Sequence, residues 1–172
     1  MASSGKFSDL VEYVDWSSVE CLNQKPGQEI GNALKQDHRD DDSLFLESDT
    51  DEQLLIFVPF NQNVKLGELV LKSTEKASGP LKVKVFVNRH SMGFDQASGE
   101  PATQEFELTE KQLEGEPVPL RFVKFQAVHA VTIFIENNQE EEETTKLAKL
   151  QFMGVSGEKM NVSEIKKVED GP

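Results

Sequence analysis

The chain is poor in the residues that cross-link a fold or carry it through a membrane. Its 172 residues include a single cysteine, Cys21, which excludes an intrachain disulfide. No window approaches the roughly 20 consecutive apolar residues that cross a bilayer. The opening residues, MASSGKFSDLVEY, lack the apolar stretch of a signal peptide. We therefore expect a cytoplasmic and nuclear protein.

Catalytic and metal-binding signals are also missing. The three histidines, His38, His90 and His129, stand far apart without metal-ligand spacing. Cys21 has no CxxC partner, and the neighbouring acids Asp15 and Glu20 oppose a thiolate, so a small apolar role is expected. No GxSxG, P-loop or GxGxxG motif occurs. We predict no enzyme activity, no cofactor and no metal.

Basic residues are few. Eighteen Lys and Arg face 31 Asp and Glu, which gives a net charge of -13. A phosphate backbone or an anionic membrane repels such a chain, whereas basic partners are favoured. We expect a monomer that binds neither nucleic acid nor membranes.

What the chain has is apolar residues in short, alternating runs. It is 37% hydrophobic and contains eleven Phe. The run LLIFVPF at 54–60 is apolar on both faces, which is typical of a central strand, and Pro59 should end or bulge it. Further strands are expected at 44–46, 64–72, 82–89, 106–108, 118–126, 130–136 and 147–155. Short strands without helical crossovers predict an antiparallel β-sandwich.

Between the strands we expect little helix. Phe7, Leu10, Val11 and Val14 have the spacing of one helix face, followed by an apolar anchor from Trp16 to Leu22. Residues 23–43 are interpreted as a surface loop that Ile30, Ala33 and Leu34 pin down. Residues 91–104 are expected to be a polar loop, and Thr109 begins a capping box that Gly115 closes.

Two acidic stretches are the candidate sites. Glu47, Asp49 and Asp51 alternate and would share one face of an extended chain, where a structural calcium ion could bind. The spacing does not fit an EF-hand, and a solvated loop before a buried strand explains it as well. The run EEEETT at 140–145 is either a solvated loop or a docking loop for a basic partner.

Several blocks together resemble one family. They are ECLN (20–23), LESDTDEQLLI (46–56), FNQNVKL (60–66), Met92-Gly93-Phe94-Asp95, ELTEKQL (107–113), PLRFVKFQAVHAVTIFIENNQEEEETT (119–145) and FMG (152–154). The blocks occur in order, from about residue 18 to 170, and resemble the PITH (proteasome-interacting thioredoxin) domain. This domain is found at the C-terminus of a thioredoxin-like protein and in free-standing proteins.

The resemblance implies a jelly-roll sandwich of the galactose-binding type and association with the 26S proteasome. No CxxC precedes Glu20, so thiol–disulfide activity is not carried over. We divide the chain into an N-terminal anchor (1–17), the β-sandwich domain (18–158) and a polar tail that we expect to be mobile (159–172).

We interpret the protein as a non-catalytic interaction module. The alternatives are a β-sandwich that binds carbohydrate or another small ligand, and a redox role for Cys21. The candidate protein-binding residues lie in loops that match the family blocks: Asp49, Asp51, Glu52, Asn61, Gln62, Asn137, Asn138, Glu141, Glu142, Glu143 and Thr144.

Overall fold

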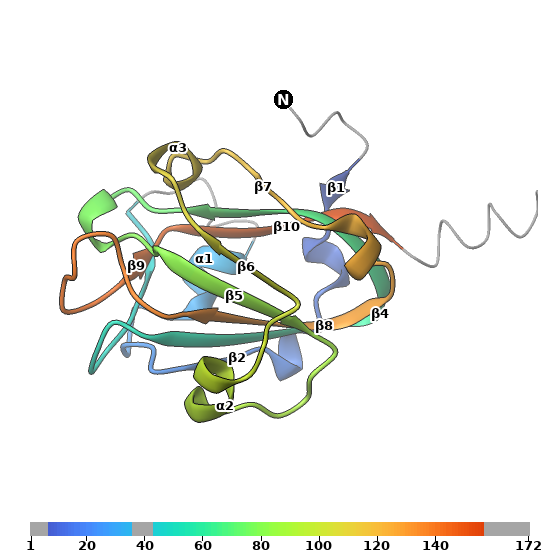
Figure 1. Ribbon diagram of the computed structural model, residues 1–172, viewed down its shortest axis with the longest axis horizontal. Helices are drawn as coiled ribbons and strands as arrows, with labels where there is room; N and C mark the ends of the chain where they lie inside the picture. Colours follow the sequence, from blue (N-terminus) through green and yellow to red (C-terminus); the bar gives the residue numbers. More distant parts are fainter. Residues whose placement is uncertain (1–6, 36–42, 157–172) are drawn as a thin grey trace, which may run out of the picture.

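The computed structural model describes residues 7–35 and 43–156, which form an antiparallel β-structure with few helices (Figure 1). Its strands are β1 (Ser8–Asp9), β2 (Glu20–Leu22), β3 (Leu46–Glu47), β4 (Leu54–Lys72), β5 (Lys82–Val87), β6 (Gln104–Glu107), β7 (Val118–Pro119), β8 (Val128–Ile135), β9 (Lys146–Leu147) and β10 (Lys149–Ser156). Its helices are α1 (Ile30–Leu34), α2 (Phe94–Gly99) and α3 (Glu110–Leu113), with 3-10 turns η1 (Val11–Tyr13), η2 (Trp16–Ser18), η4 (Lys76–Ser78) and η5 (Phe122–Lys124). None of the helices in these ranges is long and apolar enough to cross a membrane.

Strand β4 belongs to both layers of the sandwich. Its first part, from Leu54 to Pro59, pairs with β2 and β8, while its second part pairs with β10 and β7. The register shifts between Pro59 and Val64, where the strand turns from one layer into the other (Figure 1). The first layer therefore runs β2-β4-β8-β5-β6, and the second runs β1-β10-β4-β7. The prediction of an antiparallel sandwich is confirmed, and so is the irregularity at Pro59.

The main core lies between the two layers. Alternate residues of β4 and β8, such as Ile56, Val58 and Ile133, are fully buried and face inward. Phe60 meets Phe152 of the second layer edge-to-face, with 5.6 Å between the ring centroids. Each fully buried aliphatic side chain of this kind contributes about 1.5–3 kcal/mol through removal of its surface from water.

A smaller cluster covers part of the outer face of the first layer. Leu55, Phe86 and Phe134 point away from the main core and pack under Ala97 of α2. Lys84 lies on the same outer face and is buried. Its ammonium group donates to the carbonyl oxygens of Ala97, Ser98 and Glu100 at 3.1, 3.1 and 3.3 Å, which satisfies the C-terminal carbonyls of α2. A charged strand residue thus fixes the helix to the sheet.

Some predicted elements are wrong or shifted. Residues 91–104 contain α2, which begins after Gly93 and buries only Ala97, too little for a visible apolar period. The predicted strand at 118–126 ends at Pro119, which lacks a ladder donor, and η5 follows. Phe122 and Val123 of η5 are exposed, so their apolar character does not mark a buried strand face. The two strands expected at 54–60 and 64–72 are one strand.

The N-terminal segment also differs from the prediction. Of the helix expected from Phe7 to Val14, only Val11–Tyr13 is helical, as a 3-10 turn, because Ser8 and Asp9 pair with β10 instead. The predicted pins Ile30, Ala33 and Leu34 are buried, but they form α1 rather than a loop. The strand expected from residue 44 begins at Leu46. Thr109 caps α3 as predicted, and Gly115 has a φ of 121°. The predicted tail, 159–172, and His38 lie outside the described residues.

Two glycines of the second layer allow close approach of other groups. A Cβ on Gly154 would lie 1.9 Å from the carbonyl oxygen of Lys65 in β4, next to a register shift between β10 and β4. A Cβ on Gly67 would lie 2.2 Å from the ring of Phe7. The clash at Gly154 is with a backbone carbonyl, which cannot rotate away as the Phe7 side chain at Gly67 can.

We expect Gly154→Ala to destabilise the protein by at least about 2 kcal/mol, because the methyl group forces β10 and β4 apart. Urea denaturation followed by circular dichroism measures the loss. The control is Gly99→Ala at the end of α2, where a Cβ meets nothing within 4 Å. Equal stability of the two variants would contradict the close packing at Gly154.

We also expect Lys84→Met to cost about 2 kcal/mol of unfolding free energy, because it keeps the apolar stem and leaves three carbonyl groups without their donor. The matched control is Lys82→Met, which removes an exposed ammonium 3.8 Å from Glu136 and should change stability by less than about 1 kcal/mol. Denaturation curves for both variants decide the comparison. A Lys84 variant as stable as the control would show that α2 does not depend on this ammonium.

Candidate functional site

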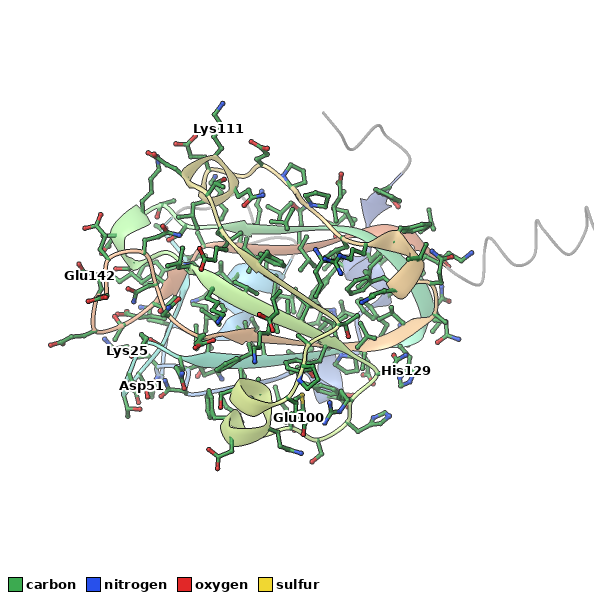
Figure 2. The ribbon with its side chains drawn as sticks, viewed as in Figure 1. Lys25, Asp51, Glu100, Lys111, His129 and Glu142 are labelled. Atoms are coloured by element: carbon green, nitrogen blue, oxygen red, sulfur yellow. The ribbon has the colours of Figure 1, made fainter. Side chains whose placement is uncertain are left out.

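The two acidic stretches form one end of the sandwich. The loop from Ser48 to Gln53 joins β3 to β4, and the loop from Glu136 to Thr145 joins β8 to β9. Because β3 pairs with β9, the two loops lie next to each other, and Asp51 and Glu142 appear at the same end in Figure 2. The Ser48 amide donates to the Thr145 carbonyl at 3.0 Å, and the Thr145 amide donates to the Ser48 hydroxyl at 2.8 Å. We call this surface the acidic end.

Asn138 shapes the loop that carries the acidic run. Its side chain is 1% exposed. The amide nitrogen donates to the carbonyls of Glu142 and Thr144 and to the Thr145 hydroxyl, at 3.0, 3.1 and 3.2 Å. The amide oxygen accepts from the Glu142 backbone at 2.8 Å. Both the donor and the acceptor group of one buried side chain are therefore used to hold the loop closed.

Asn23 does the same for the other loop. It follows β2 with a φ of 72°, a conformation that asparagine tolerates better than most residues. Its amide nitrogen donates to the Asp51 carboxylate at 2.9 Å and to the Gln53 carbonyl at 2.7 Å. Its oxygen accepts from both the amide and the hydroxyl of Thr50, at 3.1 and 2.9 Å. Sequence reasoning missed Asn23, although it belongs to the quoted block ECLN.

Most carboxylates of the acidic end face solvent. Asp49, Asp51 and Glu141 to Glu143 are exposed, whereas Glu47 is buried and accepts from the Thr144 hydroxyl at 2.7 Å. Lys25 lies 3.8 Å from Glu47. These exposed like charges repel one another across short distances, and a cationic group that docks among them relieves that repulsion.

A hollow of about 400 Å³ adjoins the acidic run. On one side of it, Lys146 and Glu75 form an ion pair of 2.9 Å. This hydrogen bond lowers the pKa of the Glu75 carboxyl and raises the pKa of Lys146. The ion pair therefore stays charged around neutral pH. The hollow is lined by Glu75, Ser78, Glu141, Glu142, Glu143, Thr144 and Lys146.

Two predicted site residues lie elsewhere. Asn61 and Gln62 follow Pro59 at the far end of the first part of β4, away from the acidic end, and Gln62 donates to Ser156 of β10. Asn137 is close to the acidic run but is occupied by structure, since its side-chain oxygen accepts from the Lys82 amide at 2.9 Å. Glu52 contributes its carbonyl, which accepts from the Thr145 hydroxyl at 2.7 Å.

The histidines, the N-terminal apolar residues and the cysteine lie outside the acidic end. His90 and His129, although 39 positions apart in the sequence, stack with their ring centroids 5.2 Å apart. Trp16 and Leu22, expected in an apolar anchor, are 40% and 42% exposed. Cys21 packs toward the main core, and burial raises the pKa of its thiol to about 12, so a reactive thiolate is disfavoured. Within residues 7–35 and 43–156, no group of three or more His, Cys, Asp and Glu side chains converges on one point.

The sequence matches the PITH domain family over residues 1–170. The chain belongs to the PITH domain family. It is 35% identical to "Thioredoxin-like protein 1" of Schizosaccharomyces pombe, covering 95% of this chain and 57% of that protein. It is 34% identical to "PITH domain-containing protein CG6153" of Drosophila melanogaster, over 87% of this chain and 69% of that protein. The chain thus spans little more than half of the fission yeast protein.

Solved structures with the same fold are distant in sequence. The CBM32-1 and CBM32-2 domains of Clostridium perfringens ZmpB, in complex with GalNAc, superpose with a TM-score of 0.65 at 10% identity, covering 87% of this chain and 36% of that one. The family 32 CBM of NanJ, in complex with galactose, gives 0.61 at 10% identity, over 86% of this chain and 98% of that one. These similarities show that this PITH domain has a galactose-binding-like jelly-roll fold and say nothing of a ligand.

We expect Asn138→Ala to destabilise this PITH domain by about 2–3 kcal/mol, because it leaves buried groups of the acidic loop without hydrogen-bond partners. Hydrogen exchange at the Glu142 amide should be faster in this variant, because that amide donates to the Asn138 side chain. Asn61→Ala, an exposed asparagine at the other end, is the control and should change stability by less than about 0.5 kcal/mol. Unchanged exchange at Glu142 would contradict the role given to Asn138.

Proposed function

We propose that this PITH domain is a non-catalytic protein-interaction module that docks on the proteasome through its acidic end, in the cytoplasm and nucleus. Proteasome association is what the resemblance to PITH domains implies. The acidic end supplies a surface for it: two loops, joined by the hydrogen bonds of Ser48 and Thr145 and braced by Asn23 and Asn138, carry exposed carboxylates.

The single observation that carries this proposal is the pre-ordered acidic loop around Asn138. A loop that is already ordered loses little conformational entropy when a partner binds. Its carboxylates attract cationic segments, and such attraction raises the association rate and selects for basic partners. We therefore propose that the contacted part of the proteasome is a segment rich in lysine and arginine.

Carbohydrate binding, the alternative reading of the sequence, has support only at the level of the fold. The bacterial domains solved in complex with GalNAc or galactose are only 10% identical in sequence to this chain. The one exposed tryptophan, Trp16, lies in η2, outside the loops of the acidic end. We do not propose a sugar site.

The test is capture from cell lysate with the tagged full chain, scored for proteasome subunits. We expect wild type to capture them and the triple variant E141K/E142K/E143K to lose at least about tenfold, because three attractive charges become repulsive. Raising the salt concentration should weaken capture by wild type, since exposed charges are screened.

The matched control changes the net charge equally, away from the acidic end. It is the triple variant E12K/E105K/E116K, whose three glutamates are exposed. Capture equal to wild type in this control assigns the effect to the acidic loop rather than to overall charge. Failure of wild type to capture any proteasome subunit would refute the proposal, and full capture by the E141K/E142K/E143K variant would remove the acidic loop from it.

A further inference from the structure

The outer face of the first layer is only partly covered. Helix α2 packs over Leu55, Phe86 and Phe134, on strands β4, β5 and β8, whereas Leu22 of β2 is 42% exposed. A hollow of about 190 Å³ lies there, between the strands and the segment that leads into α2. It is lined by Glu20, Leu22, Leu55, Phe57, His90, Ser91, Met92 and Thr132. We call it the β2 hollow.

One cross-strand row forms its floor. Glu20 of β2 pairs with Phe57 of β4, which pairs with Thr132 of β8. Side chains of paired residues stand side by side on one face of a sheet. A carboxylate, an aromatic ring and a hydroxyl therefore follow one another across the floor. Leu22 and Leu55, the next pair along β2 and β4, extend it with apolar surface.

Thr132 is the unusual member of this row. The residue is 2% exposed and lines the hollow, and its hydroxyl has no hydrogen-bond partner within residues 7–35 and 43–156. In these ranges the one fully buried side-chain polar atom without a partner is Glu68 Oε1, so the Thr132 hydroxyl oxygen is open to the hollow. A hydroxyl that faces the hollow and is not used by the protein is where a ligand would place a hydrogen-bonding group.

Glu20 supplies the charge. It is exposed on β2, which in the described chain pairs only with β4, and it forms no ion pair with a described residue. Arg89, next to the His90 that lines the hollow, is already held 2.8 Å from Glu100. The net charge of -13 adds to the attraction for a cation. Leu22, 42% exposed, offers apolar surface beside the carboxylate.

From this arrangement we propose that the β2 hollow receives the side chain of an arginine from a partner protein. The aliphatic stem lies on Leu22, Leu55 and Met92, as long cationic side chains lie on apolar surfaces. The planar guanidinium stacks on Phe57 and donates to both the Glu20 carboxylate and the Thr132 hydroxyl. Arginine fits better than lysine because its fork of donors serves two acceptors at once and its plane matches the ring.

The size of the hollow agrees with a single side chain. Sites for drug-sized ligands measure about 300–1,000 Å³, and the β2 hollow is smaller than that. Its position also connects it to the acidic end, because Leu22 is followed by Asn23, which holds the Asp51 loop. A basic segment lying along β2 would thus place one arginine in the hollow and further cations near Asp51.

This inference rests on the proposed function in one respect, that the partner is a protein. Its test does not need that partner. The full chain is labelled with 13C at the methionine methyl groups, of which Met92 lines the hollow and Met153 lies on β10 in the other layer. Met92→Leu and Met153→Leu assign the two signals. The probe is Nα-acetyl-arginine N-methylamide, and the matched probes contain citrulline, which is neutral, or norleucine, which is apolar.

We expect the arginine probe to shift the Met92 signal saturably and to leave Met153 unmoved, with the citrulline and norleucine probes binding about tenfold more weakly. Glu20→Gln should weaken the arginine probe about tenfold, which corresponds to about 1.4 kcal/mol. Thr132→Val, which keeps the shape and removes the hydroxyl, should weaken it severalfold. Glu12→Gln, an exposed glutamate on η1, should have no effect.

An unmoved Met92 signal would overturn the inference, and so would equal binding of the arginine and norleucine probes or unchanged binding to the Glu20→Gln variant. These outcomes are separate from those of the lysate capture. If the probe fails while capture still depends on Glu141 to Glu143, the proposed function stands without the β2 hollow. If the probe binds but capture fails, the hollow is a site for arginine on some other partner.

Discussion

The continuity of β4 is the constraint on which the rest of the structure depends. One strand from Leu54 to Lys72 pairs with β2 and β8 in the first layer and with β10 and β7 in the second. The shift between Pro59 and Val64 lets the chain cross between layers while its inward side chains still reach the same core. Gly154 allows β10 to approach β4 closely enough to pair with it. Because the loop that contains Asp51 leads directly into the start of β4, the position of this strand places the loop at the end of the sandwich.

The acidic end shows how an acidic surface is kept in order. Repulsion among exposed carboxylates would spread such loops apart. Hydrogen bonds of uncharged side chains oppose it: the buried Asn138 binds across its own loop, the partly exposed Asn23 binds the Asp51 loop, and the buried Thr145 joins the two. Uncharged side chains therefore hold the loops, and the charged groups that could contact a partner are exposed. Hydrogen bonds to uncharged side chains also hold at salt concentrations that screen the surface charges.

The same division of roles recurs on the outer face of the first layer. Lys84, a residue usually found at the surface, is buried there and holds α2 by its carbonyl groups. Helix α2 covers Leu55, Phe86 and Phe134, and the β2 hollow lies beside it. A buried charged residue thus holds the helix that borders the hollow.

The sequence by itself determined the fold class, the central strand at Leu54, the cap at Thr109 and the acidic character of both loops, because these depend on alternation, turn residues and composition along the chain. It misplaced α2 and the strand after Pro119, where few residues are buried and alternation is uninformative. Only the tertiary structure decided which residues meet. It joined Ser48 to Thr145 across 97 positions, stacked His90 on His129, and separated Asn61 from the acidic end. Such contacts follow from strand pairing between distant segments, and no local pattern records which strands will pair.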